Sequence, residues 1–327
     1  GVKVKKVPAF QAPLLMDRLS ATLGYNGFEG MDLVVEAVPE NLDLKKTVFK
    51  DLEQAVSDAT IIASNTSSLS IDDMAQSLQH PERFLGIHFF SPVQKMPLVE
   101  VIPSERTDPK VVGDVCNMVL KNKKFPVIVK NCPGFLINRI LLPYVNEAVK
   151  LVLQGFKVDD IDKIATDFGM PLGPLALADE VGLDVGYKVL KILHEGYGER
   201  MAIPHTFRTI VEEDQILGKK SGLGFYRYSG DTASVNLELY KQHSIVVKQR
   251  ISDQDQTEIL DRLILIMVNE AARCIQESIV ESAEVLDLAM IMGTGFPPFR
   301  GGLLRYADER GVADIVLRLN QLAQSVD

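Results

Sequence analysis

The chain has 327 residues, of which 46% are hydrophobic and 24% are charged, a composition typical of a soluble globular protein with two or three domains. Its net charge of −9 argues against a surface for nucleic acid or for an anionic membrane, and no run of 18 apolar residues predicts a membrane span. The cysteines, Cys116, Cys132 and Cys274, are too scattered for a disulfide framework or a zinc site, so we predict a reducing, intracellular compartment and no metal.

The opening segment, "GVKVKKVPAFQ", resembles neither a natural N-terminus nor the first strand of a domain. No secretory signal is visible in it. We therefore expect the chain to begin inside a larger protein.

Residues 31–130 alternate between strand and helix patterns. Short apolar runs of the kind buried in a parallel sheet occupy 31–38, 60–64, 83–90, 98–103 and 125–130. Helical spacing separates several of these runs, at 41–57, 70–78 and 108–121. Strands that alternate with helices in this way predict an α/β domain, which we place at residues 1–130.

From residue 131 onward the pattern is helical, and it contains an internal repeat. "INRILLPYVNEAVKLVLQG" (137–155) resembles "LDRLILIMVNEAARCIQES" (260–278), and the tetrapeptide "VNEA" is identical in both. Downstream of each, residues 160–182 are echoed by residues 285–311. Amphipathic helices resemble one another, but an identical tetrapeptide followed by a second matched segment favours duplication.

Two helical domains of one kind therefore follow the α/β domain. We place the first at 131–228, because the Gly-rich aromatic stretch "GKKSGLGFYRY" is typical of a domain end. Residues 229–255 are polar and are predicted to be a linker. The second helical domain is predicted at 256–327.

His88 and Glu100 are ionisable residues in strands that are otherwise apolar. His88 lies in "RFLGIHFFSP" (83–92), and Glu100 lies in "MPLVEVIP" (96–103). A carboxylate bonded to one imidazole nitrogen fixes the tautomer and raises the basicity of the other nitrogen, which suits acid–base chemistry. A satisfied core histidine and a solvated glutamate are the alternative, and the spacing alone leaves both interpretations open.

Polar side chains also follow two of the predicted strands. "EAVPEN" (36–41) ends one strand and "ASNTSSL" (63–69) follows the next, so their side chains would lie at the carboxyl edge, where ligands bind in such sheets. Lys45, one turn into a helix, and Asn138, at a helix start, would face the same crevice. Local caps and a hydrogen-bonded amide explain the loop residues and Asn138 equally well. For Lys45 taken alone, an ordinary solvated helix charge is the better interpretation.

Taken together, these segments resemble the L-3-hydroxyacyl-CoA dehydrogenase family. The resemblance is carried by "VVEAVPENLDLKK", "ASNTSSL", "GIHFFSPVQKMPLVEVI", "PGFLINR" and "FGMPLGPLALADEVGLD", and it runs from about residue 20 to the end. It implies a Rossmann-type NAD-binding domain, followed here by two repeated all-α domains. The duplicated helical domain resembles that of multifunctional fatty-acid β-oxidation enzymes, in which the dehydrogenase follows an enoyl-CoA hydratase domain.

The resemblance implies an oxidoreductase that converts L-3-hydroxyacyl-CoA to 3-ketoacyl-CoA. It implies that His88 is the acid–base residue, that Glu100 is its partner, and that Ser67 and Asn138 hold the 3-oxygen of the acyl-CoA substrate. Its further implications are an NAD cofactor with Glu40, Lys45 and Asn65 near the nicotinamide, and a thiolase subunit as a partner. The other hypothesis is a non-catalytic scaffold that kept the fold for assembly or for acyl-CoA binding.

One departure from the family concerns the phosphates of NAD. The family opens with a strand, a G-x-G-x-x-G turn and a helix, whereas the early glycines here, Gly24, Gly27 and Gly30, have neither strand before them nor helix after them. We therefore expect the Rossmann domain to be incomplete at its N-terminus and the 327-residue chain alone to bind NAD weakly or not at all. The compartment is predicted to be cytoplasmic in a bacterium and peroxisomal or mitochondrial in a eukaryote.

The repeat also carries an expectation about assembly. Single-copy members of the family dimerise through the helical domain, and a second copy in the same chain can supply that partner internally. We predict an internal pseudo-dimer of 131–228 with 256–327, and a chain that is monomeric in isolation.

Overall fold

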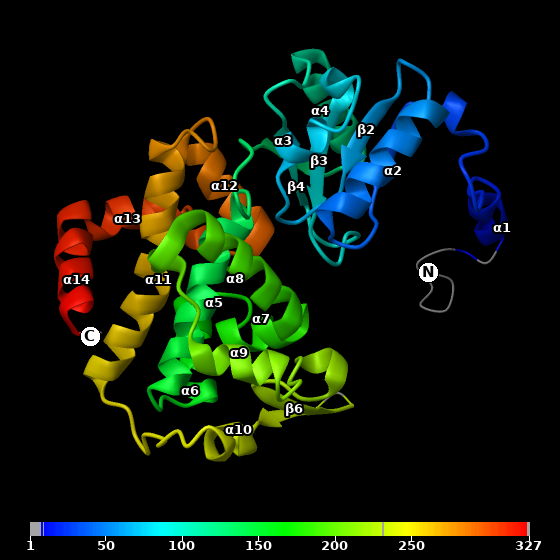
Figure 1. The fold of residues 1–327 in the computed structure, drawn as a ribbon. Coiled ribbons are helices and arrows are strands. Elements are labelled where there is room, and N and C mark those ends of the chain that lie inside the picture. The colour runs from blue at the N-terminus through cyan, green and yellow to red at the C-terminus, as the bar shows by residue number, and fades with distance from the viewer. Residues whose placement is uncertain (1–7, 9, 231, 326–327) are drawn as a thin grey trace.

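The computed structural model describes residue 8, residues 10–230 and residues 232–325. The opening residues 1–7, part of the segment that we expected to lie inside a larger protein, are outside the described residues. Figure 1 shows the two parts of the molecule: a sheet with flanking helices at the upper right, and a larger helical body below and to its left. The chain crosses from one part to the other just before α5.

The sheet has five strands in chain order, and it confirms the predicted α/β domain. The strands are β1 (Leu33–Glu36), β2 (Ile61–Ser64), β3 (Phe84–Phe89), β4 (Leu98–Pro103) and β5 (Phe125–Ile128). Neighbouring strands are parallel except for β3 and β4, which are antiparallel. The carboxyl ends of β1, β2 and β3 therefore lie at one edge, and β4 begins at that same edge.

Three helices cover the faces of the sheet: α2 (Leu42–Ala55), α3 (Ile71–Ala75) and α4 (Pro109–Lys121). The side chain of Asn41 caps α2 by accepting the N–H of Leu44 at 2.9 Å, and α2 buries Phe49 and Leu52 against the core. Ahead of β1 the described residues form the short helix α1 (Gln11–Met16), which buries none of its side chains, and a 3₁₀ turn.

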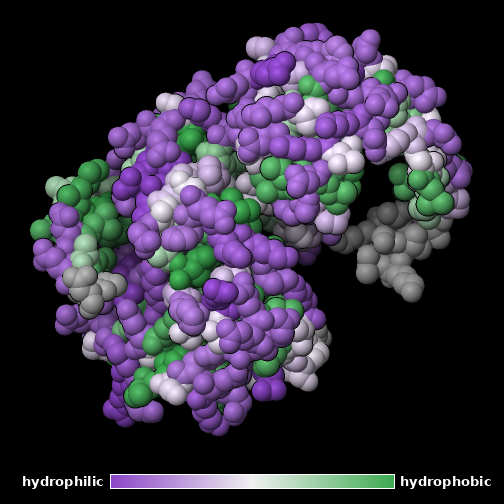
Figure 2. Space-filling model, viewed as in Figure 1, coloured by the Kyte–Doolittle hydropathy of each residue, from purple (hydrophilic) through white to green (hydrophobic). Residues whose placement is uncertain are grey.

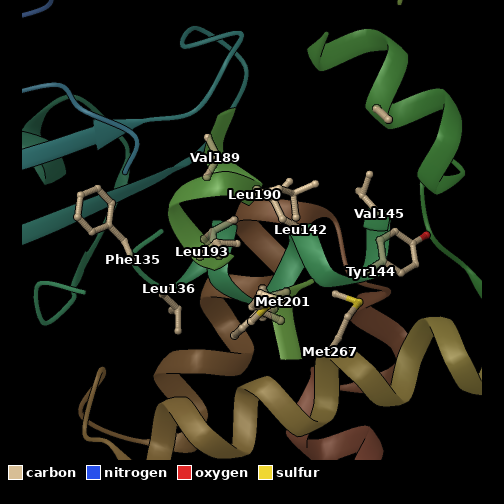
Figure 3. Close-up of a cluster of buried hydrophobic side chains, with 14 of the residues drawn as sticks. Phe135, Leu136, Leu142, Tyr144, Val145, Val189, Leu190, Leu193, Met201 and Met267 are labelled. Atoms are coloured by element: carbon tan, nitrogen blue, oxygen red, sulfur yellow. The ribbon is translucent and has the colours of Figure 1, made fainter. Parts of the chain in front are cut away.

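The first helical unit is built around α5 (Ile137–Leu153), which is buried on almost every side. Four further helices surround it: α6 (Val158–Phe168), α7 (Pro174–Val181), α8 (Leu183–Tyr197) and α9 (His205–Glu212). Figure 3 shows the packing, with Leu190 and Leu193 of α8 above α5 and Met267 of a later helix approaching Tyr144 from the opposite side. A helix enclosed in this way is the centre of its domain.

The predicted linker at 229–255 is wrong in its first half. At the start of this range, β6 (Tyr226–Ser229) pairs with β7 (Thr232–Val235), and residues 237–242 form the helix α10 (Leu237–Gln242). The apolar side chains of Leu239 and Tyr240 are buried against the first helical unit. The segment looked like a linker because few of its residues are apolar, but the apolar residues it has pack against the first helical unit.

The second helical unit repeats the first four helices of the first unit; within the described residues, α9 and α10 have no counterpart in it. It consists of α11 (Asp253–Gln276), α12 (Ala283–Thr294), α13 (Leu303–Arg310) and α14 (Val312–Ser325), in the order of α5 to α8. In the first unit Asp162 of α6 accepts two backbone N–H groups at the start of α7, and Asp287 of α12 does the same for α13. A shared capping arrangement at matched positions supports the duplication that the sequence predicted.

The two units exchange ion pairs reciprocally across α5 and α11. Arg139 of α5 binds Glu270 of α11 at 3.3 Å, and Arg262 of α11 binds Glu147 of α5 at 2.7 Å. The four residues occupy the same two positions of the repeat. A contact in which position i meets j, and j meets i, is the mark of a two-fold interface.

The surface in Figure 2 is largely hydrophilic, with apolar side chains gathered at the left over α14. The exposed apolar residues of that helix are Val312, Val316 and Leu317. Among the described residues, no helix is both long enough and apolar enough to cross a membrane.

Candidate active site

His88 and Glu100 face each other across the antiparallel strands β3 and β4. The strand register pairs them directly, and Nδ1 of His88 lies 2.6 Å from Oε2 of Glu100. Both side chains are buried, and the ring of Phe90 lies 4.4 Å from the imidazole, centroid to centroid. The burial of Glu100 excludes the solvated glutamate of the alternative interpretation, and a buried pair at this distance is compatible with acid–base chemistry.

The second oxygen of Glu100 reaches the helical unit. Oε1 accepts the backbone N–H groups of Leu136 and Ile137, both at 3.0 Å, at the N-terminus of α5. A helix N-terminus favours negative charge, so α5 stabilises the ionised carboxylate that the imidazole needs as a partner. The two ionisable residues in apolar strands thus join the sheet to the first helical unit.

The hydrogen bond from Nδ1 decides the chemistry of the imidazole. With Nδ1–H donated to Glu100, the proton of the neutral ring sits on that nitrogen, and Nε2 carries the free lone pair. His88 is therefore arranged to accept a proton at Nε2 while Glu100 stabilises the resulting imidazolium.

Ser67 of the sheet domain and Asn138 of the first helical unit lie in contact. The side-chain amide of Asn138 donates to the backbone carbonyl of Ser67 at 3.0 Å, across 71 positions of sequence. Asn138 directly follows Ile137, whose N–H binds Glu100, so the same helix start serves both contacts. Both side chains are half-buried, which leaves each able to meet a ligand.

Asn65 ties the Ser67 loop to the strand of His88. Its side-chain oxygen accepts the N–H of Phe89 at 3.2 Å, next to His88, and its own N–H binds the carbonyl of Glu36. The loop after β2 is therefore held in register with both neighbouring strands, which positions Ser67 at the carboxyl edge of the sheet.

Lys45 is fully buried, which the sequence pattern did not predict. Its ammonium lies 2.8 Å from Glu36 and 3.3 Å from Glu40, and Glu40 in turn accepts the N–H of Ser67 at 3.1 Å. Lys45 thus orients Glu40, and through it the Ser67 loop. Glu36 is not among the predicted site residues, although it is a charged residue inside the apolar run "VVEAV", the same kind of signal as His88 in its strand.

Within the described ranges, no group of three His, Cys, Asp or Glu side chains could hold a metal ion. The cysteines are also unsuited to chemistry. Burial raises the pKa of the Cys132 thiol, and it raises that of Cys274 to about 12, so both stay protonated at neutral pH.

Two of the residues predicted to lie near the nicotinamide of NAD occupy the carboxyl edge of the sheet. Glu40, with its side chain partly exposed, and Asn65 follow neighbouring parallel strands at the edge where open α/β sheets bind ligands. In the described part of the chain ahead of β1, the glycines Gly24, Gly27 and Gly30 lie in open, turn-like backbone without a preceding strand. Weak NAD binding by the 327-residue chain stays a prediction.

Two family models account for most of the chain. Residues 2–132 match "3-hydroxyacyl-CoA dehydrogenase, NAD binding domain", and residues 134–228 match "3-hydroxyacyl-CoA dehydrogenase, C-terminal domain". The solved (S)-3-hydroxybutyryl-CoA dehydrogenase of Ralstonia eutropha is 36% identical, over 70% of this chain and 81% of that enzyme, with a TM-score of 0.65. The chain belongs to the 3-hydroxyacyl-CoA dehydrogenase family. The NAD-binding fold and the helical region inferred from the sequence are thereby confirmed.

Longer relatives of the family match the whole arrangement. The fatty acid oxidation complex subunit alpha of Vibrio cholerae is 42% identical over 307 residues, which are 94% of this chain and 43% of that protein. The 3-hydroxybutyryl-CoA dehydrogenase of Escherichia coli K12 is 25% identical and superposes with a TM-score of 0.83, over 99% of this chain and 84% of that one. This chain thus spans less than half the length of the curated relatives it matches.

Proposed function

We propose that this chain carries the L-3-hydroxyacyl-CoA dehydrogenase activity of a fatty-acid β-oxidation enzyme. The observation that carries the proposal is the buried His88–Glu100 pair beside Ser67 and Asn138. A scaffold has no use for a histidine in an apolar strand with one nitrogen held by a carboxylate, since burying such polar groups costs free energy.

In the proposed reaction, Nε2 of His88 accepts the proton of the substrate's 3-hydroxyl group. Glu100 stabilises the imidazolium, and Ser67 and Asn138 hold the 3-oxygen in line with His88. NAD, when bound, supplies the hydride acceptor, with Glu40 and Asn65 at its nicotinamide end. In the reverse direction His88 returns the proton to the 3-oxygen of the ketone.

The direct test is reduction of acetoacetyl-CoA by NADH, catalysed by the longest natural form of the protein that contains this chain. We expect turnover in the usual enzyme range of about 1–10³ s⁻¹, followed as the loss of NADH absorbance. Binding of acyl-CoA without any turnover would instead support the scaffold hypothesis.

The wider setting of the activity follows from the relatives. The Vibrio cholerae protein is named as a subunit of a fatty acid oxidation complex. By that likeness we propose an enoyl-CoA hydratase domain in the same polypeptide, a thiolase subunit as partner and an intracellular location.

We also propose that the second helical unit replaces a dimer partner. The reciprocal pairs Arg139–Glu270 and Arg262–Glu147 support this, as does a third matched pair of positions: Arg139 also binds Glu277 at 2.6 Å, and Arg262 binds Gln154 at 2.6 Å. The contacts of Arg139 with Glu270 and Glu277 thus correspond to the contacts of Arg262 with Glu147 and Gln154.

If the partner is internal, the isolated chain is a monomer. We expect light scattering to give a mass near 36.2 kDa across a range of concentrations. A stable dimer that dissociates when Leu263 or Met267 of α11 is replaced by Asp would contradict the proposal, because both side chains are fully buried in the single chain.

A further inference from the structure

A glycine of the second helical unit packs against two residues that adjoin Glu100. Gly293 is buried in the last turn of α12, and a Cβ built on it would lie 2.6 Å from Cδ2 of Leu98 in β4 and 3.0 Å from Cδ1 of Ile137 in α5. Figure 1 shows α12 at the junction between the helical body and the sheet. Glycine is a poor helix former, so its presence inside α12 has a packing reason: the close approach of these two side chains.

Both side chains that meet Gly293 belong to residues tied to Glu100. Leu98 stands two positions before Glu100 in β4, so the two side chains point to the same face of the sheet. Ile137 donates its backbone N–H to Oε1 of Glu100 at 3.0 Å. Leu98 and Ile137 are each 1% exposed, which leaves neither side chain room to turn toward solvent. The contact with α12 therefore holds both the strand that carries Glu100 and the helix start that binds it.

The second helical unit holds the same region at two further points. Arg139, two positions after Ile137, binds Glu277 at the end of α11 at 2.6 Å. The N–H of Lys130, just after β5, donates to the carbonyl of Ile279, between α11 and α12, at 2.8 Å. The start of α5 and the segment that leads to it are thus both fixed to a unit that supplies none of the predicted site residues.

We propose that Gly293 is a positioning residue for the reaction, an inference that rests on the proposed function. By admitting α12 against Leu98 and Ile137, it sets the position of the Glu100 carboxylate, and through it the orientation of His88. Carbon atoms in contact lie about 3.5–4.0 Å apart, so a Cβ at position 293 displaces its neighbours by about 1 Å. A misplacement of about 1 Å at a reacting group lowers the rate by up to about a hundredfold.

The experiment measures acetoacetyl-CoA reduction by NADH with Gly293→Ala and Gly293→Val in the longest natural form of the protein. We expect kcat to fall by about tenfold for Ala and by about a hundredfold for Val, because the larger side chain displaces Leu98 and Ile137 further. The KM for NADH should change little, because the contacts of Glu40 and Asn65 do not involve α12.

The matched control is Gly113→Ala in α4. A Cβ built on Gly113 meets no atom within 4 Å, so the same substitution should leave kcat unchanged there. A thermal melt of each variant checks that the fold is kept, and Gly293→Ala alone decides the question if Gly293→Val does not fold.

A second comparison separates positioning from a loss of folded protein. Gly293→Ala should lower kcat in the wild type but not in a His88→Gln background, where the imidazole that Glu100 orients is gone. A loss of folded protein lowers kcat by the same factor in both backgrounds. Equal losses in both, or a folded Gly293→Ala variant with normal kcat, would overturn the inference and leave the proposed function standing on turnover by the wild type. A wild type without turnover would overturn both.

Discussion

Replacing His88 with Gln lowers kcat for the reduction of acetoacetyl-CoA by about 10²–10⁴, which is the usual contribution of general acid–base catalysis. Glutamine keeps a polar group of similar size next to Glu100 but cannot carry the proton at the position of Nε2. The loss should be in kcat, because His88 acts on the reacting proton, while the KM for NADH changes little. Steady-state kinetics with the longest natural form of the protein measure both.

The matched control is His80→Gln. His80 is an exposed histidine whose imidazole lies 3.1 Å from Glu82, and none of the described residues that it contacts belongs to the candidate site. The same substitution there should leave kcat unchanged. Glu100→Gln should cost less than His88→Gln, because it removes the stabilising charge and keeps the base. Near-normal turnover by His88→Gln at saturating substrate would show that another group transfers the proton.

Replacing Arg139 with Met destabilises the chain by about 3 kcal/mol, the lower end of the range for breaking a buried ion pair. Arg139 is fully buried between α5 and α11. Burial alone would lower the pKa of Arg139, but its hydrogen bonds to Glu277 raise it, and the hydrogen bond from Arg139 lowers the pKa of the Glu277 carboxyl. Met at this position leaves the buried carboxylate of Glu270 with fewer partners. Arg200, whose Nε lies 3.0 Å from Glu270, still pairs with it and so reduces the loss of stability.

Urea unfolding followed by circular dichroism gives the free energy of unfolding. Arg305→Met serves as the control, because Arg305 pairs with Glu309 at the surface, where an ion pair contributes less than about 1 kcal/mol. Equal, small losses for both variants would mean that the reciprocal pairs do not hold the two helical units together. The result bears directly on the internal pseudo-dimer.

The sequence by itself determined the elements and the chemistry-bearing residues of the sheet. Short apolar runs are local signals, and all five predicted strands are present. The repeat was visible because a duplicated helix keeps its periodicity and its "VNEA" segment. His88 and Glu100 could be singled out because burying an ionisable group in an apolar strand costs free energy unless the group has a partner. That contrast between one ionisable residue and its apolar neighbours is visible in the local sequence.

The tertiary structure alone decided how these residues meet. Whether His88 faces Glu100 depends on the antiparallel register of β3 and β4, which no local pattern encodes. The burial of Lys45 depends on two carboxylates, one from a neighbouring strand and one from the loop after it. The anchoring of 229–242 likewise depends on apolar surface supplied by a distant helical unit. Periodicity reports which face of an element is apolar, whereas pairing, register and burial arise from contacts between elements. Those contacts are decided only in the folded chain, even where the partners lie as close in sequence as Lys45 and Glu36.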